Sequence, residues 1–461
     1  MSIINSIESA LWAYLLIAVL LGCALWFTIR SRFVQFRLLK DMILQLAEST
    51  GKHDGSKHIS SFQAFAVSVA TRVGTGNLAG VAIAISTGGP GAVFWMWLIA
   101  LLGSATAFVE STLAQLFKIR GKDSYIGGPA YYMKKGLHAP WLGVVFAILI
   151  TLTFGFSYNS IQSNTICGAM QKAFGWEPLY VGTILTITSL VIFFGGIQRI
   201  AKFSSIIVPI MAIGYVLLAL FILAVNIQYI PHMIAEIFKQ AVGVEPIAGG
   251  TLGGAIMIGV KRGLFSNEAG EGSAPNAAAT ASVSHPVKQG LIQSLGVFTD
   301  TLLICSCTAF IILLSGLYET GATDGIVLTQ SALEAEIGPV GSIFVALAIL
   351  FFAFSSIIGN YYYGEANISY LTPRKWIIQV YRVLVGAVVF LGAISNLQLV
   401  WSLGDLFMAL LTGCNLIAII FLANYAFRLL RDYEKQKHEG RNPVFHRSQM
   451  PDIADELDCW E

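Results

Sequence analysis

The chain has 461 residues, of which 56% are hydrophobic and only 12% are charged, and its formal net charge is +2. Because an average soluble domain carries about 25% charged residues, this composition excludes a soluble globular protein of this size. The mean hydropathy of +0.71 indicates an all-α protein that crosses a membrane many times.

About 20 apolar residues span a bilayer, and the chain contains eleven segments of roughly that length or longer. They lie at 10–29, 60–85, 91–117, 141–171, 179–196, 203–226, 247–283, 289–316, 340–370, 377–394 and 399–427. Lysines and arginines gather in alternate connections, namely 30–59, 118–136, 199–202, 288, 374–375 and the tail after 427. The positive-inside rule therefore predicts an external N-terminus, a cytoplasmic C-terminus and an odd number of spans.

Two of these segments contain too many glycines and polar residues to be ordinary membrane helices. The first holds "ATRVGTGNLAG" (70–80), and the second holds "GGTLGG" and "GVKRGLFSNEAGEGSAP" (259–275). Backbone that leaves a helix at membrane depth needs protein or a wet cavity to satisfy its polar groups. When the first span is set aside, the two broken segments are the first and sixth of ten, which is the pattern of a five-plus-five inverted repeat.

This pattern divides the chain into four parts. Residues 1–59 are predicted to form an extra N-terminal helix and a basic cytoplasmic loop, and 60–226 the first five-helix repeat. Residues 227–427 are predicted to form the second, inverted repeat, and 428–461 a cytoplasmic tail.

A helix that stops inside a membrane exposes free backbone N–H groups on one side of the break and free carbonyls on the other. The N–H groups attract a carboxylate, and the carbonyls attract Na⁺ or an ammonium group. The candidate residues are Thr75, Gly76 and Asn77 in the first break, with Phe265, Ser266, Asn267 and Gly270 in the second. The alternative is that the glycines only let helices pack closely.

Charged residues at membrane depth cost about 2.5–3.5 kcal/mol each on insertion scales, so each needs a physical reason. Such residues are Arg72, Glu110, Lys261, Arg262, Glu268, Glu271, Asp300, Glu365 and Asp405. We expect Arg72 to pair with Glu268 or Glu271 and Asp300 to be paired in the interior. Glu110 and Glu365 are expected to cap or snorkel near cytoplasmic helix ends.

Two further segments carry polar side chains within apolar helices. Ser355, Ser356 and Asn360 lie within one and a half helical turns, and adjacent hydroxyls suit a Na⁺ shell because hard cations prefer oxygen ligands. The alternative is that these hydroxyls bond to their own helix. Gln162 offers an amide on a segment with few other polar groups.

The stretches "GGPGAVFWMWLIALLG" (88–103) and "GVKRGLFSNEAGEGSAPNAAA" (259–279) resemble the alanine-or-glycine:cation symporter family of bacteria and archaea. The resemblance covers nearly the whole chain from about Trp12. It implies the LeuT-like ten-helix fold with one extra N-terminal helix. It also implies uptake of small neutral amino acids across the bacterial inner membrane, driven by Na⁺ or, in some members, by H⁺.

The resemblance also implies roles for individual residues. The substrate carboxylate is expected on the backbone amides around Thr75, Gly76 and Asn77, with Gln162, Phe265, Ala269, Ser356 and Asn360 completing the substrate site. A Na⁺ site is expected from the carbonyls of Ala70 and Val73 with Ser355 and Ser356. A second ion site at Asn77 and the backbone of Arg72 stays open. Because Asn360 replaces a tryptophan of other members, glutamine stays open as a substrate beside alanine and glycine.

Two other classes of protein are alternatives for this sequence. The pattern Gly74-x-Gly76-x-x-Ala79 is compatible with a nucleotide-binding enzyme, but such a site needs a strand–turn–helix unit and an acidic residue about 20 positions later. Residues 90–100 contain no acidic residue. A channel lined by the polar breaks is the other alternative, although single deep charges suit an occluded site better. No cofactor, catalytic residue or nucleic-acid partner is predicted, and no oligomeric state is assigned.

Overall fold

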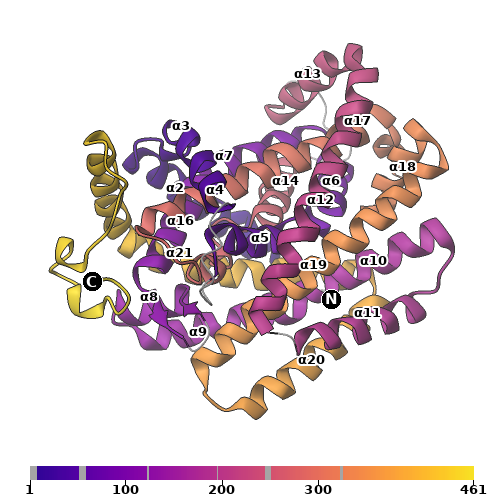
Figure 1. The fold of residues 1–461 in the computed structure, drawn as a ribbon. Helices are drawn as coiled ribbons and strands as arrows, with labels where there is room; N and C mark the ends of the chain where they lie inside the picture. The colour runs from indigo at the N-terminus through magenta and orange to yellow at the C-terminus, as the bar shows by residue number, and fades with distance from the viewer. Residues whose placement is uncertain (1–7, 51–58, 122–123, 195, 244–250, 322–324) are drawn as a thin grey trace.

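A computed structural model describes residues 8–50, 59–121, 124–194, 196–243, 251–321 and 325–461. Nearly all of the described chain is helical, which confirms the predicted all-α class (Figure 1). The one sheet within these ranges is an antiparallel pair, β1 (Ile119–Arg120) and β2 (Tyr125–Ile126). The glycines at 249–250 of the "GGTLGG" stretch, and residues 51–58 of the predicted basic loop, lie outside the described ranges.

The elements of the first half follow the predicted segments closely. They are η1 (Leu11–Leu16), α2 (Ile17–Arg30), α3 (Val34–Arg37), α4 (Leu39–Thr50), α5 (Ser61–Arg72), η2 (Gly76–Gly80), α6 (Val81–Gly88), α7 (Gly91–Leu116), α8 (Pro129–Lys135), α9 (Pro140–Ile150), η3 (Thr151–Tyr158), α10 (Asn159–Phe174), α11 (Pro178–Phe193), α12 (Gly196–Val225), η4 (Ile227–Tyr229) and α13 (Ile230–Ala241). The elements α9, η3 and α10 form one continuous helix, Pro140–Phe174.

The second half begins with the other broken segment. Its elements are α14 (Leu252–Asn267), α15 (Ala274–Ala278), α16 (Pro286–Val297), η5 (Phe298–Cys305), α17 (Ser306–Ser315), η6 (Leu317–Thr320), α18 (Gly325–Ile337), α19 (Pro339–Leu371), α20 (Lys375–Ile394), α21 (Leu397–His438), η7 (Arg447–Gln449) and η8 (Ala454–Glu456). The elements α16, η5 and α17 again form one continuous helix, Pro286–Ser315.

Seven helices of the described chain are long and apolar enough to cross a membrane. They are Gly91–Leu116, Pro140–Phe174, Ser205–Val225, Pro286–Ser315, Pro339–Leu371, Lys375–Ile394 and Leu397–His438. Three shorter helices, Ile17–Arg30, Gly76–Gly88 and Pro178–Phe193, are also apolar. Helices suit a membrane span because a helix satisfies its own backbone hydrogen bonds in lipid.

The interior is built around the two broken segments. Helix α7 packs against α14 and α16, and α10 packs against α19 and α20, so helices from the two halves of the sequence alternate. The pair α11 and α20 lies side by side at one edge of the bundle (Figure 1). This arrangement brings the centre of α5–η2 against the end of α14.

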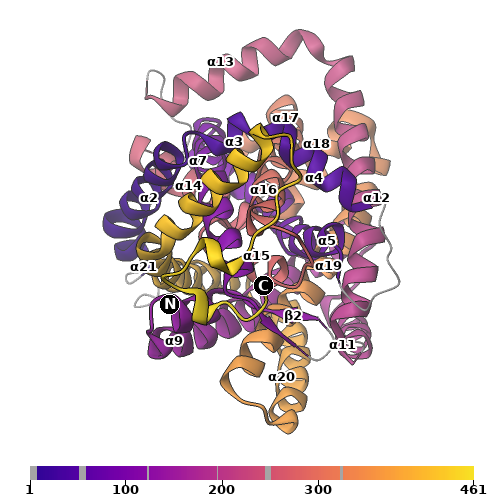
Figure 2. The same ribbon diagram turned by 60° about the vertical axis from the view of Figure 1, so that its left-hand side comes forward.

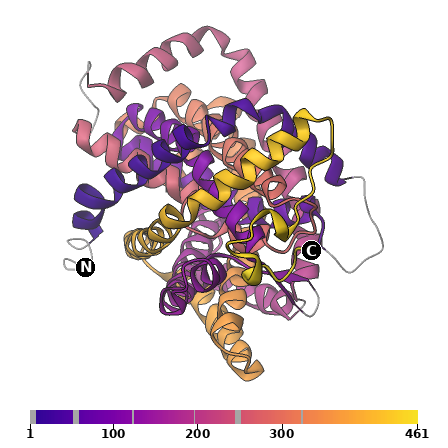
Figure 3. The same cartoon turned by 90° about the vertical axis from the view of Figure 1, so that its left-hand side faces the viewer.

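Hydropathy located the apolar segments but not the full lengths of the helices. Helix α21 continues to His438, eleven residues past the predicted end at 427, and its last turns lie beside the C-terminal tail (Figures 2 and 3). The helix is longer than the predicted membrane span because hydropathy marks the edge of the apolar region, whereas backbone hydrogen bonding continues beyond it. Ion pairs of Glu434 with Arg37 and of Lys437 with Asp41 tie this extension to α3 and α4.

Candidate functional site

The first broken helix separates α5 from η2. Val73 leaves the helix with an extended backbone (φ −77°, ψ 93°). Two freed backbone N–H groups bond to side-chain oxygens: Gly74 N–H donates to Asn77 Oδ1 at 2.9 Å, and Thr75 N–H donates to Gln162 Oε1 at 3.1 Å. The Thr75 hydroxyl donates to the same Gln162 oxygen at 2.7 Å. Two donors of the first break therefore converge on one neutral oxygen of α10.

The second broken helix separates α14 from α15. Glu268, Gly270 and Gly272 all have positive φ values, of 56°, 97° and 78°, a conformation that glycine adopts without steric cost. The carboxylate of Glu110 on α7 accepts hydrogen bonds from Gly270 N–H at 3.3 Å and Gly272 N–H at 3.2 Å. It also accepts one from Asn415 Nδ2 at 3.0 Å. A single carboxylate thus closes the second break.

Glu110 was expected to cap or snorkel at a cytoplasmic helix end. The structure differs: the residue is 0% exposed, which excludes snorkelling, and its carboxylate bonds to backbone N–H groups of the second broken helix. The sequence placed Glu110 on α7 correctly, but the groups it caps lie 160 residues away.

The two breaks meet at Gly76. A Cβ on Gly76 would lie 2.9 Å from Ser266 Cα and 3.1 Å from Phe265 Cδ1. The ring of Phe265 packs against the rings of Tyr158 and Trp401, with centroid distances of 4.7 and 4.9 Å. The structure therefore brings predicted residues of both breaks together beside an aromatic wall that consists of Tyr158, Phe265 and Trp401. Of these three residues, only Phe265 was predicted from the sequence.

The four residues of the predicted Na⁺ site lie on two helices. Ser356 Oγ donates to Ala70 O at 2.8 Å, and Ser355 Oγ approaches the same carbonyl at 3.4 Å. Both hydroxyls also bond to Phe352 O in their own helix, as the alternative interpretation expected. Val73 follows at the end of α5. The site residues Ala70, Ser355 and Ser356 thus form one cluster of oxygens.

Asp300 in η5 forms a second cluster of oxygens next to the first break. Its Oδ1 accepts a hydrogen bond from Asn77 Nδ2 at 2.6 Å, and its Oδ2 accepts from Ser266 Oγ at 2.6 Å and Thr301 Oγ1 at 2.9 Å. The expectation that Asp300 is buried with partners is confirmed, since the residue is 1% exposed. These partners are an amide and two hydroxyls, so they bring no positive charge to balance the carboxylate.

The remaining predicted substrate residues lie in different surroundings. Asn360 Nδ2 donates to Asn159 Oδ1 at 3.1 Å, whereas Asn360 Oδ1 is buried and has no hydrogen-bond partner in the described chain. Ala269 lies apart from the other seven, because its methyl group packs against α7 in a cluster with Ala100 and Ala107.

Arg72 does not form the ion pair expected with Glu268 or Glu271. Its Nη1 donates to Gln293 O at 3.2 Å, and its Nε and Nη2 have no hydrogen-bond partner among the described residues. The guanidinium lies against α16, since a Cβ on Gly296 would collide with it. The prediction was wrong because the neighbour of this face of α5 is α16, which sequence spacing does not reveal.

The two carboxylates of the second break use neutral partners instead. Glu268 accepts a hydrogen bond from Ser273 Oγ at 2.5 Å, and Glu271 accepts from the Tyr158 hydroxyl at 3.1 Å. Tyr158 therefore links Glu271 to the ring of Phe265. No local pattern indicates this link, because a tyrosine in an apolar helix is ordinary.

A layer of buried charges lies one helical turn from Phe265. Arg262 forms an ion pair with Asp405, and Lys261 forms one with Glu8 and a second with Asp405 at 3.6 Å. The Arg262 guanidinium lies 4.5 Å from the Trp401 ring centroid. These four residues are at most 8% exposed, so the ion pairs are buried beside the aromatic rings.

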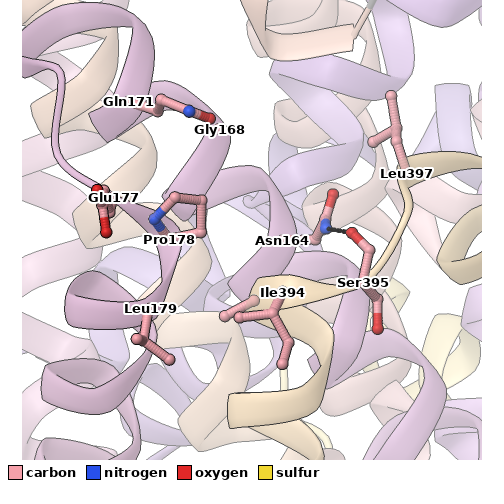
Figure 4. Close-up of a pocket in the computed structure, with 10 residues that line it drawn as sticks. Asn164, Gly168, Gln171, Glu177, Pro178, Leu179, Ile394, Ser395 and Leu397 are labelled. Carbon is pink, nitrogen blue, oxygen red and sulfur yellow. Dashed lines mark hydrogen bonds between the residues drawn. The ribbon is translucent and has the colours of Figure 1, made fainter.

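A cavity of about 470 Å³ lies away from the breaks, near the connections α10–α11 and α20–α21 (Figure 4). Asn164 and Ser395 lie side by side in its lining, and Asn164 Nδ2 donates to Ser395 O at 2.7 Å. None of the predicted substrate or Na⁺ residues lines this cavity.

The nucleotide-binding interpretation of Gly74-x-Gly76 is wrong. Helix α5 precedes these glycines where a dinucleotide site requires a strand. The glycines lie inside a broken helix at the centre of the bundle.

The sequence matches the sodium:alanine symporter family over residues 1–447. It is 51% identical to the amino-acid carrier protein AlsT of Bacillus subtilis, over 100% of this chain and 97% of that protein. It is also 51% identical to the probable sodium/glutamine symporter GlnT of the same organism, over 99% of this chain and 95% of that protein.

The fold matches a solved transporter of much lower sequence identity. The crystal structure of MhsT in complex with L-phenylalanine aligns with a TM-score of 0.53 at 14% identity, over 87% of this chain and 93% of that one. At this identity the match concerns the fold alone, and it agrees with the LeuT-like fold that the resemblance implied.

Proposed function

The chain belongs to the sodium:alanine symporter family, and we propose that it takes up alanine or glycine together with Na⁺ at a site between its two broken helices. It is a multi-pass membrane transporter and not an enzyme. Transporters of this design bind substrate near the bilayer midplane, where broken helices present free backbone groups.

The observation that carries the proposed site is the convergence of two donors on one oxygen. Thr75 N–H and Thr75 Oγ1 both donate to Gln162 Oε1, at 3.1 and 2.7 Å. A substrate carboxylate offers the same kind of acceptor with a full negative charge, and charge-assisted hydrogen bonds are roughly twice as strong as neutral ones. The carboxylate takes the place of Gln162 Oε1, and the displaced amide turns its Nε2 toward the ligand.

Two clusters of oxygens are candidates for the coupling ion. Ala70 O, Val73 O, Ser355 Oγ and Ser356 Oγ form the proposed Na⁺ site, supported by the distances of 2.8 and 3.4 Å between the two hydroxyls and Ala70 O. Asp300, with Asn77 and Ser266, supports a second cation. It shares only Asn77 with the second ion site left open above, which used Asn77 and the backbone of Arg72. A cation there balances the charge of a carboxylate whose protein partners are neutral. H⁺ in place of Na⁺ is the alternative.

Asn360 bears on the choice of amino acid. Its Oδ1 is a buried acceptor without a described partner, and an unpaired buried acceptor costs about 1–3 kcal/mol. The side-chain amide of glutamine carries a donor that would satisfy it, and the similarity to GlnT favours the same alternative. Alanine and glycine have no side-chain donor, so with these substrates only water could donate to Asn360 Oδ1.

We infer that eleven segments cross the membrane: the seven long apolar helices, the shorter ones at Ile17–Arg30, Pro178–Phe193 and α5–α6, and the broken α14–α15. The halves 60–226 and 227–427 form the inverted repeat. The distribution of basic residues supports an external N-terminus and a cytoplasmic C-terminus in the bacterial inner membrane.

Alternating access then requires the charged layer to open. Arg262 and Lys261 on α14 separate from Asp405 on α21 when the site faces outward. Because these charges are buried and hydrogen bonded, separation requires their hydration. Burial of the proposed substrate residues supports a state that is closed on this side.

The test is uptake of labelled alanine by proteoliposomes that contain the purified protein. We expect saturable uptake that requires an inward Na⁺ gradient and is reduced by excess glycine. Uptake indifferent to both Na⁺ and H⁺ gradients would refute symport. Parallel competition by glutamine ranks the two substrate alternatives.

A further inference from the structure

A second pocket lies where the first helix ends, far in sequence from the breaks. It has a volume of about 280 Å³ and lies between the end of α2, the turn into α3 and the later part of α21. Its lining residues are Ile29, Arg30, Ser31, Arg32, Arg37, Phe427, Leu430, Arg431 and Glu434. Four of these nine residues are arginines, and one is acidic.

The arginines of this pocket are only partly neutralised. Arg37 forms an ion pair with Glu434 and donates to the carbonyls of Arg32 and Ser31, both at 3.1 Å. Arg32 and Arg431 are exposed and have no hydrogen bond or ion pair to another described side chain. The pocket therefore keeps an excess of positive charge after its one acidic residue is paired.

Arg30 and the backbone turn complete the basic rim. The Arg30 guanidinium lies 5.8 Å from the centroid of the Phe427 ring, on the wall of the pocket. Arg32 and Phe33 both have left-handed backbone conformations, with φ of 56° and 58°. This sharp turn folds α3 back, so that the side chain of Arg37 reaches the carbonyl of Ser31.

The approach to the pocket is apolar. On α2, Leu25, Trp26 and Ile29 are 48%, 40% and 56% exposed. Trp26 and Phe427 pack edge to face with a centroid distance of 5.9 Å, which joins the two helices beside the pocket. In a membrane protein such surfaces face hydrocarbon, so the arginines stand where the apolar face of α2 ends.

We propose that this pocket binds the phosphodiester headgroup of an anionic phospholipid, with the acyl chains along the exposed face of α2. Guanidinium groups suit phosphate because their planar N–H groups match its oxygens. A free phosphate would use only the arginines, whereas a lipid also covers the adjacent apolar surface. Basic pockets between membrane helices at the cytoplasmic side are chemically suited to such headgroups.

The experiment measures lipid binding by the full-length protein in detergent, using native mass spectrometry and titration with phosphatidylglycerol or phosphatidylcholine. We expect phosphatidylglycerol to bind at least about tenfold more tightly than phosphatidylcholine. The variant Arg32→Gln/Arg431→Gln should lose most of this preference, because it removes two of the four positive charges of the pocket. Both side chains are exposed, so their replacement should leave the packing intact. Phosphatidylglycerol binding unchanged in this variant would overturn the proposal.

Two controls separate a lipid pocket from general basic charge. The variant Arg374→Gln/Lys375→Gln removes the same charge at another exposed connection and should keep the preference. An equal loss in this variant would show that net charge, not the pocket, attracts the lipid. Inorganic phosphate at millimolar concentration should not displace phosphatidylglycerol; full displacement would identify a phosphate site instead.

Discussion

The two broken helices both contain backbone N–H groups without a partner in their own helix, but these groups bond to different kinds of acceptor. In the first break, the freed N–H of Thr75 bonds to the neutral amide oxygen of Gln162. In the second, the freed N–H groups of Gly270 and Gly272 bond to the carboxylate of Glu110. A neutral oxygen on a neighbouring helix can be replaced by a ligand, whereas a buried carboxylate with three donors is costly to move.

The difference teaches that two breaks alike in glycine content need not share a role. We expect the first break to exchange partners during transport and the second to remain closed by Glu110.

The variant Glu110→Ala should have the largest effect, because it leaves the backbone N–H groups of Gly270 and Gly272 without their acceptor and removes one hydrogen bond of the Asn415 amide. Each unpaired buried donor costs about 1–3 kcal/mol. We expect a clear fall in the melting temperature of the detergent-solubilised protein. The matched control is Glu365→Gln, which removes a charge that is partly exposed and paired with Arg382, and its effect should be small. An unchanged melting temperature for Glu110→Ala would show that the second break does not depend on this carboxylate.

The variant Asn77→Leu should abolish uptake without abolishing membrane insertion. Asn77 joins the Gly74 N–H of the first break to the Asp300 carboxylate, and leucine supplies neither contact. Uptake in proteoliposomes and the yield of folded protein are measured together. Normal uptake would remove Asn77 from the site, and failure to insert would give it a structural role.

Two substitutions of Gln162 test separately the effect of charge and the effect of the amide at the first break. Gln162→Glu places a negative charge opposite the proposed substrate carboxylate and should reduce uptake strongly by repulsion. Gln162→Met removes the amide without adding charge, and we expect a loss of apparent affinity of about tenfold, the value of one hydrogen bond to a charged group. Equal effects of the two variants would contradict a carboxylate at this position.

The variant Ser356→Ala should have the smallest effect on the fold and should selectively weaken Na⁺ binding. It removes the hydroxyl that lies 2.8 Å from Ala70 O. We expect the Na⁺ activation curve to shift to higher concentration, with little change in alanine affinity at saturating Na⁺. A curve that superimposes on that of the parent protein would exclude Ser356 from the ion site.

Much of the candidate site was predictable because backbone breaks leave a local signature. Glycines and polar residues inside an apolar segment identify a break, and they located Thr75, Gly76, Asn77 and Phe265. The partners were harder to predict. Tyr158, Trp401 and Glu8 carry no local signal, and each becomes part of the arrangement only because helices distant in sequence meet.

Composition and hydrophobic periodicity by themselves determined that this chain is a helical membrane protein with two interrupted segments. That information is local, because the cost of placing polar backbone or charge in lipid applies residue by residue. Only the tertiary structure decided the pairings: Arg72 with Gln293 instead of a carboxylate, Asp300 with Asn77, and Glu110 with the second break. These pairings depend on which helix faces come into contact. The paired residues are 160 to 223 positions apart, so no single segment of the sequence predicts their contact.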